Sequence, residues 1–177
     1  MTDSERGFVL KNLEEGRDAF LRSIAGLSEA QLRFKPQPDR WSIGDCIEHV
    51  ATAEEAMYAG ATRGAPNPNG VSLDPEKDAR LVAAVVSRSR KVPAPGPMRP
   101  TKRFASVEEA RGHFLNIRAR AIDFARECSE DLRRLFAVHP FLGEIDCHRY
   151  LLVLAAHPIR HAAQIEEIKS DPAFPKA

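Results

Sequence analysis

The chain has 177 residues, enough to bury a sizeable core, and we expect a single domain over residues 1–177. Its 26 Lys and Arg residues nearly cancel its 25 Asp and Glu residues, so the charge balance gives no support to nucleic-acid binding. The first residues are polar, and the longest wholly apolar run, 151–156, is far shorter than the ~20 residues that span a bilayer. We therefore expect no signal peptide and no membrane partner. Three cysteines without a framework spacing favour a reducing cytoplasm.

The first half of the chain predicts two long helices. Apolar spacing predicts the first over Phe8–Ile24. The next stretch, Leu27–Arg40, contains two prolines and is expected to be a connector without a continuous helix. The second helix is predicted over Ser42–Arg63, where Ser42 is the expected N-cap and Asp45, three residues later, completes an Asp variant of the capping box.

A long crossover is expected over Gly64–Ala105. It contains seven of the 13 prolines of the chain. Within it, the dipeptide Asp74-Pro75 is expected to open a short helix that ends at Arg90, because proline is tolerated in the first turn of a helix.

The second half predicts two more long helices and no strand. One begins at Ser106, where Glu109 completes another capping box. A loop that includes Gly143 follows, and the last helix is predicted over Ile145–Lys169. No strand-like alternation persists long enough to compete. Four long amphipathic helices with one long crossover predict an all-α four-helix bundle, in which that crossover lets the second and third long helices run parallel.

Two histidines interrupt the apolar stripe of the last helix. His157 and His161 lie four residues apart on the side that should face the core, and imidazoles at this spacing converge on one point. A buried polar ring costs free energy unless something satisfies it, and a metal ion would satisfy both rings. His49 lies beside the apolar stripe of the second helix. Three histidines from two helices suit an open metal site with a remaining position for water.

Other interpretations stay open at these positions. The three histidines would also suit the edge of the core, bonded to backbone carbonyls. Cys46, one turn before His49, is another candidate ligand, although a free cysteine usually packs as a hydrophobe. Asp45 either orients His49 or only favours the start of its helix. Gln164 either bonds a ligand or a metal-bound water, or is a polar residue at the bundle edge. We assign no role to the histidines without a partner at metal spacing: His113, His139 and His148.

The motif Trp41-Ser42-Ile43-Gly44-Asp45 up to His49, followed by His157-Pro158-Ile159-Arg160-His161 and Gln164, resembles the DinB-like superfamily and its DinB_2 type. The likeness extends from about residue 8 to residue 174, and further segments support it: 89–92, 104–110 and 139–143. Pro158 departs from the pattern, because it deletes a backbone hydrogen bond inside the ligand helix and is expected to disturb the ligand geometry there.

The resemblance implies an up-up-down-down four-helix bundle. It implies that His49, His157 and His161 hold a divalent metal ion, often zinc or nickel. Relatives in the superfamily include metal-dependent transferases and isomerases that use low-molecular-weight thiols, and metal-dependent hydrolases. A homodimer is also implied, and the apolar crossover residues Leu81, Val82, Val85 and Val86 would serve it or would cover the bundle's own core.

Two functions from different classes remain. The first is a metal-dependent enzyme that acts on a small molecule by thiol transfer or hydrolysis. In the last helix, Glu166 and Glu167 lie beyond the ligands and are expected to point outward, so no general base is evident and thiol transfer is favoured. The second is a non-catalytic metal-binding bundle with a structural or stress-related role. Glu48 and Arg160 are expected to face solvent or a neighbouring helix.

Overall fold

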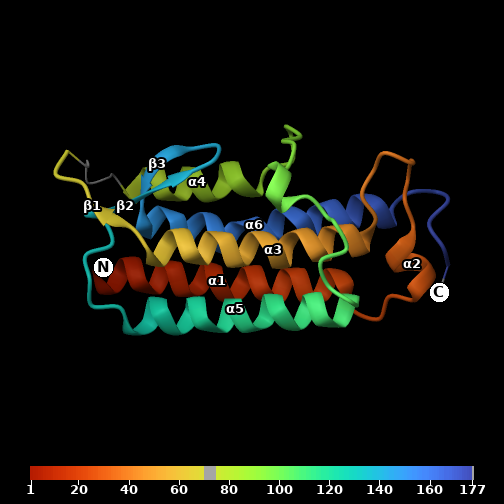
Figure 1. Ribbon diagram of the computed structural model, residues 1–177, viewed down its shortest axis with the longest axis horizontal. Helices are drawn as coiled ribbons and strands as arrows, with labels where there is room; N and C mark the ends of the chain where they lie inside the picture. Colours follow the sequence, from red (N-terminus) through yellow and green to blue (C-terminus); the bar gives the residue numbers. More distant parts are fainter. Residues whose placement is uncertain (70–74, 177) are drawn as a thin grey trace.

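The computed structural model describes residues 1–69 and 75–176. Four long helices form a bundle (Figure 1): α1 (Asp3–Ile24), α3 (Ile43–Thr62), α5 (Val107–Glu127) and α6 (Cys147–Lys169). Helices α1 and α3 each pack against both α5 and α6, so the order around the bundle is α1, α6, α3, α5. The all-α four-helix bundle predicted from the sequence is confirmed.

The long helices run in two directions. Helices α3 and α5 are parallel, because Glu54 pairs with Arg118 while Tyr58, one turn later, meets Phe124. Helices α1 and α6 run the other way (Figure 1). The order is therefore up-down-down-up, whereas the resemblance implied up-up-down-down. The connector after α1 stays at one end of the bundle, so α3 must return. The crossover then carries the chain back along the bundle, and α5 starts at the same end as α3. The parallel direction of these two helices was predicted from the length of the crossover.

The caps of the helices are close to those expected. The capping box of α3 is present: the Ser42 hydroxyl accepts from the Asp45 N–H (3.1 Å) and the Asp45 carboxylate accepts from the Ser42 N–H (2.9 Å). At α5 the box is incomplete, because the Glu109 carboxylate accepts from the N–H of Ala105 instead. A short helix, α2 (Glu29–Arg33), lies in the connector. The two prolines of the connector come after this helix, so they do not interrupt it.

The crossover lies on the outside of the bundle. It includes β1 (Ala65–Pro66), α4 (Pro75–Val86) and the 3-10 turn η1 (Gly96–Met98). Helix α4 packs on α6 and ends at Val86, four residues before the predicted end, and Asp74 of the predicted start lies outside the described residues. On α4, Leu81, Val82 and Val85 pack against the core of the bundle. They therefore cover the protein's own core, and the homodimer stays a prediction.

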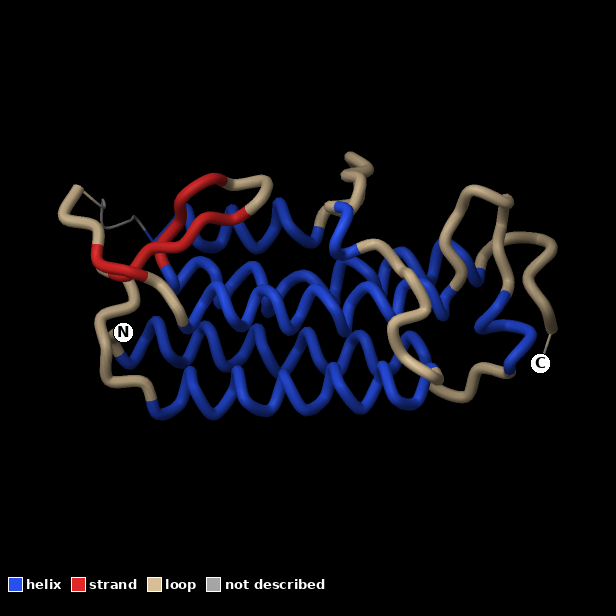
Figure 2. The backbone as a smooth tube through the Cα atoms, in the orientation of Figure 1, coloured by secondary structure: helices blue, strands red, loops and turns tan. Residues whose placement is uncertain are grey.

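A β-hairpin replaces the loop expected before the last helix. Strands β2 (Leu135–His139) and β3 (Gly143–Asp146) pair antiparallel, and β1 adds to β2 to give the order β1-β2-β3. Figure 2 shows this hairpin on the same side of the bundle as the crossover. Gly143 has a positive φ of 69°, which suits a tight turn. The strands are too short for a persistent alternation, so the sequence pattern missed them and placed the start of α6 two residues early.

The core divides into two apolar clusters, one toward each end of the bundle. The cluster nearer the hairpin includes Leu13 and Leu152, and the other includes Phe20 and Ile165. None of the described helices is both long and apolar enough to cross a membrane. The three predicted histidines lie between the two clusters, with His49 and His161 buried and His157 half-buried.

Buried charges join α4 to the hairpin end of the bundle. The Asp78 carboxylate of α4 accepts from Arg133 and, at 3.0 Å, from Arg149. His148 is fully buried beside them, with its Nδ1 3.7 Å from the Asp78 carboxylate. Within the described residues neither of its ring nitrogens has a hydrogen-bond partner. Burial lowers the pKa of His148 from 6.5 to about 4, and the nearby Arg133 contributes.

We expect His148→Leu to reduce the acid sensitivity of the fold. The folded protein disfavours protonated His148, whereas the unfolded chain binds the proton near pH 6.5. The free energy of unfolding is therefore unaffected by His148 above pH 6.5 and falls as the pH drops from 6.5 to about 4. The lowering of the His148 pKa from 6.5 to about 4 corresponds to a loss of about 3 kcal/mol in the free energy of unfolding. Urea unfolding at pH 7 and pH 4.5 should show a smaller loss in the variant than in the wild type. His113→Leu is the matched control, and equal losses in wild type and His148→Leu would contradict this account.

Candidate metal centre

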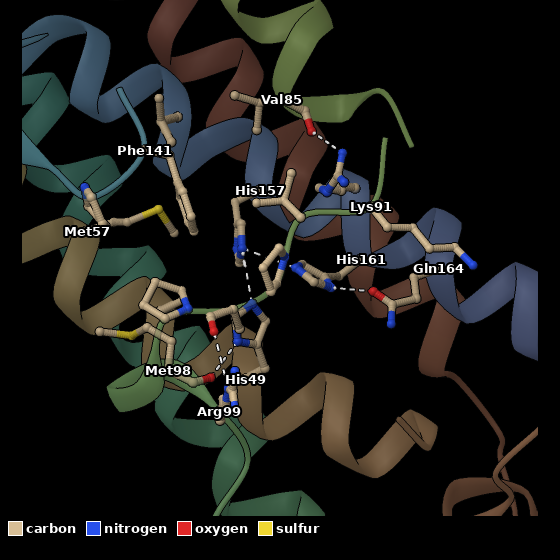
Figure 3. Close-up of a pocket in the computed structure, with 18 of the residues that line it drawn as sticks. His49, Met57, Val85, Lys91, Met98, Arg99, Phe141, His157, His161 and Gln164 are labelled. Carbon is tan, nitrogen blue, oxygen red and sulfur yellow. Dashed lines mark hydrogen bonds between the residues drawn. The ribbon is translucent and has the colours of Figure 1, made fainter. Parts of the chain in front are cut away.

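Three histidines from two antiparallel helices meet between the apolar clusters (Figure 3). His49 comes from α3, and His157 and His161 come from successive turns of α6. The Nε2 atom of His157 lies 3.3 Å from Nε2 of His49 and 3.1 Å from Nε2 of His161. One ring nitrogen from each residue lies within 4.8 Å of the others. The structure therefore brings all three predicted residues together.

Hydrogen bonds on the far side of two rings define their tautomers. Nδ1 of His49 lies 2.6 Å from the carbonyl oxygen of Met98, and Nδ1 of His161 lies 3.0 Å from the side-chain oxygen of Gln164. Arg88 donates to the same Gln164 atom, which identifies it as the oxygen. A carbonyl oxygen only accepts, so both Nδ1 atoms donate and both Nε2 atoms present a lone pair to the centre. Metal-binding histidines are usually oriented in this way.

The donor set fits a divalent metal. Two nitrogens bound to tetrahedral zinc at about 2.0–2.1 Å are about 3.3 Å apart, close to the distances from Nε2 of His157 to Nε2 of His49 and of His161. Burial lowers the pKa of His49, and it lowers the pKa values of His157 and His161 well below 6.5, with the neighbouring rings contributing for the latter two. All three rings are thus held neutral at pH 7, as metal ligation requires.

The structure decides between the interpretations left open for Cys46, Asp45 and Gln164. Cys46 is fully buried in the apolar cluster around Phe20, and burial raises the pKa of its thiol to about 12, so it packs as a core residue. Asp45 caps α3 and pairs with Lys35 at 2.8 Å, which makes it a helix-start residue. Gln164 bonds His161 and orients its ring.

Pro158 is accommodated by a buried ion pair. A helical N–H at position 158 would bond the carbonyl of Leu154, and proline has none. Arg118 supplies the missing donor: its Nη2 lies 2.9 Å from the Leu154 oxygen, and its Nη1 bonds the carbonyl of Leu13 at 3.0 Å. Glu54 balances the charge, with Arg118 Nε 2.6 Å from its carboxylate. Helix α6 therefore continues past Pro158 to Lys169, and the Nε2 atoms of His157 and His161 lie 3.1 Å apart.

A cavity of about 790 Å³ opens beside the histidines. Side chains from α3, α4, α6, the crossover and the hairpin loop line it, and Met57, Val85 and Phe141 are among them (Figure 3). Among the described residues, no Asp, Glu or Cys joins the three histidines at ligand spacing. The three nitrogens thus leave one side of the centre open to the cavity, in contrast to a structural site with four protein ligands.

Comparison with known proteins identifies the family. The family model of the DinB superfamily matches residues 12–165. The chain belongs to the DinB superfamily. It is 25% identical over 161 residues to the uncharacterized protein YuaE of Bacillus subtilis (strain 168), covering 88% of this chain and 93% of YuaE.

A solved structure of similar fold is YfiT from Bacillus subtilis. The TM-score is 0.62 at 14% sequence identity, and the match covers 99% of this chain and 91% of YfiT. YfiT is described as a probable metal-dependent hydrolase with an unusual four-helix bundle topology. The similarity supports the four-helix-bundle fold.

Two residues of this DinB-superfamily chain hold the crossover over the site. The Glu48 carboxylate accepts from the backbone N–H groups of residues 101, 102 and 103 at 2.6–3.1 Å. Arg160 donates to the carbonyls of Val85, Ser87 and Arg90. Each directly precedes a histidine of the cluster, His49 or His161. Helical periodicity placed Glu48 and Arg160 on the outer faces of their helices. It could not indicate that the crossover packs on those faces.

We expect Gln164→Leu to weaken metal binding roughly 10- to 100-fold, as is typical when the orienting partner of a histidine ligand is lost. Gln164→Glu retains the acceptor for His161 Nδ1 and should bind metal nearly as tightly as the wild type. Glu167→Gln, which weakens the partner of Arg88 without touching His161, is the control. A chelator-competition titration measures all four affinities. Wild-type affinity in Gln164→Leu would show that this bond does not orient the ring.

Proposed function

We propose that this protein is a metal-dependent enzyme that acts on a small molecule. In this proposal His49, His157 and His161 hold a divalent metal, most often zinc or nickel, and the reaction is thiol transfer or hydrolysis. The observation that carries this proposal is the geometry of the cluster: the Nε2 atoms of His49 and His161 present lone pairs to one point, and a cavity lies beside that point. A metal bound there would lower the pKa of a bound water or thiol, or would polarise a carbonyl.

The residues around the cavity favour thiol transfer. Water activation usually needs a general base within hydrogen-bond reach. Among the described residues that line the cavity the single carboxylate is Asp39, on the connector before α3. Nδ1 of His139 accepts from the N–H of Phe141, so it is not free to take a proton. A thiolate needs no such base, which supports a low-molecular-weight thiol as the second small-molecule partner.

The cavity also favours an enzyme over a purely structural metal site. A structural role would be supported by a dry centre closed by a fourth protein ligand. Here the open side of the cluster faces a space of about 790 Å³, large enough for a substrate. The three cysteines are buried and unpaired, which supports the expected location in a reducing cytoplasm.

Turnover assays on metal-loaded protein test this proposal. Zinc- and nickel-loaded samples are assayed for transfer of several low-molecular-weight thiols to 1-chloro-2,4-dinitrobenzene, and for hydrolysis of p-nitrophenyl esters. We expect metal-dependent turnover that is lost in His157→Ala/His161→Ala. Absence of turnover in every metal form, or equal turnover in the double variant, would overturn the enzymatic proposal.

A further inference from the structure

The cavity has an apolar end on the hairpin side of the histidines. Because α3 and α6 are antiparallel, the residues that follow His49 and those that precede His157 lie on the same side of the cluster. They include Met57 and Val153. The hairpin loop completes this side with Phe141, whose side chain remains 54% exposed although it lines the cavity. An exposed aromatic ring at a cavity mouth is suited to cover the apolar part of a ligand.

The opposite end of the cavity carries cationic side chains, because Arg40 precedes α3, Arg88 bonds Gln164 and Lys91 lies on the Gln164 side of the histidines. Five cationic side chains line the cavity against one carboxylate, Asp39, although the net charge of the whole chain is only +1. They are Arg40, Arg88, Lys91, Arg99 and Arg160. In Figure 3, Lys91 and Gln164 lie on one side of the histidines, and Met57 and Phe141 lie on the other.

Two of these cations are available to a ligand. Arg88 already pairs with Glu167, and Arg99 and Arg160 bond carbonyl groups of the crossover. Arg40 and Lys91 are exposed, and within the described residues no carboxylate lies at ion-pair distance from either. Charge of one sign at a cavity mouth attracts and orients ligands of the opposite sign.

We propose that the substrate is a small organic anion with an apolar body. The apolar body packs against Met57 and Phe141, the anionic group lies near Arg40 and Lys91, and the reactive atom lies between them at the histidine cluster. The cavity volume of about 790 Å³ suits a ligand of this kind. The position of the reactive atom rests on the proposed function, whereas the preference for an anion rests on the cavity alone.

A matched set of probes tests the preference for an anion. 4-Phenylbutyrate, 4-phenylbutanamide and 4-phenylbutylamine share one shape and differ in charge. Trp41 is the single tryptophan of the sequence and lines the cavity, with its ring centroid 4.8 Å from that of His49, so its fluorescence reports binding. We expect the butyrate to bind, with or without zinc, roughly tenfold more tightly than the amide, and the amine to bind least.

Paired variants test each end of the cavity. Arg40→Gln/Lys91→Gln should weaken butyrate binding roughly three- to tenfold and leave the amide unchanged. Lys77→Gln, which removes an exposed charge outside the cavity, should change neither. Phe141→Ala should weaken both probes several-fold. Val138→Ala, on the same hairpin but outside the cavity and 73% exposed, should not.

The outcomes separate this inference from the proposed function. Equal binding of the three probes, or butyrate binding that needs zinc and survives Arg40→Gln/Lys91→Gln, would overturn the inference while metal uptake still supports the metal site. Failure to bind zinc or nickel, with the anion preference intact in the metal-free protein, would overturn the proposed function and leave the anion site standing.

Discussion

Arg118→Met is expected to lower the free energy of unfolding by about 3–5 kcal/mol, the usual cost of breaking a buried ion pair. Arg118 and Glu54 are both fully buried in the middle of the bundle. Without the guanidinium, Glu54 has no counter-ion, and burial already raises the pKa of this carboxyl to about 7. The carbonyls of Leu13 and Leu154 also lose their donor. Urea unfolding at pH 7 measures the loss.

A double-mutant cycle with Pro158→Ala tests the reason for this effect. Alanine at position 158 restores the N–H that can bond the Leu154 carbonyl, so Arg118→Met should cost about 1 kcal/mol less in that background. Because Leu154 lies in the turn before His157, Arg118→Met should also weaken metal binding, and Pro158→Ala should recover part of it. Glu54→Leu/Arg118→Met is the control that removes both charges, and it should cost less than Arg118→Met alone. Strictly additive effects of Arg118→Met and Pro158→Ala would contradict the compensation.

His161→Ala is expected to weaken zinc binding roughly a thousandfold, because one of three nitrogen ligands is lost from a site whose total binding free energy is on the order of 10 kcal/mol. Cys46→Ala should leave the affinity unchanged, since the Cys46 thiol belongs to the apolar cluster around Phe20. His113→Ala is the histidine control, because this ring pairs with Glu55 away from the cavity.

Competition with a chromophoric chelator measures these zinc affinities. Loss of affinity in Cys46→Ala equal to that in His161→Ala would show that the cysteine is a ligand and would contradict the three-histidine site.

The sequence predicted the parts of the fold that depend on local pattern. Apolar periodicity and the Ser42 cap placed α3 within one residue at each end, and the spacing of His157 and His161 indicated their common face. The hairpin was missed because strands as short as β3 (Gly143–Asp146) leave almost no alternation to detect. The directions of the helices depend on where each connection runs, which periodicity does not record.

The supporting residues of the site were beyond sequence analysis for a different reason. Glu48 and Arg160 bond a crossover that has no regular pattern, and Arg118 bonds Leu154, which lies 36 residues away in another helix. Periodicity assigns a side chain to a face of its helix and does not name the partner across that face. The one available signal was Pro158, because a proline inside a helix requires another donor for the carbonyl four residues earlier.

Elemental analysis of the purified, tag-free protein beside His157→Ala/His161→Ala tests the central claim most directly. We expect about one zinc or nickel per wild-type chain and none in the double variant, with X-ray absorption showing nitrogen ligands at about 2.0–2.1 Å if the metal is zinc. A wild-type protein that carries no metal and takes up neither zinc nor nickel, or a double variant with the same metal content as the wild type, would contradict it.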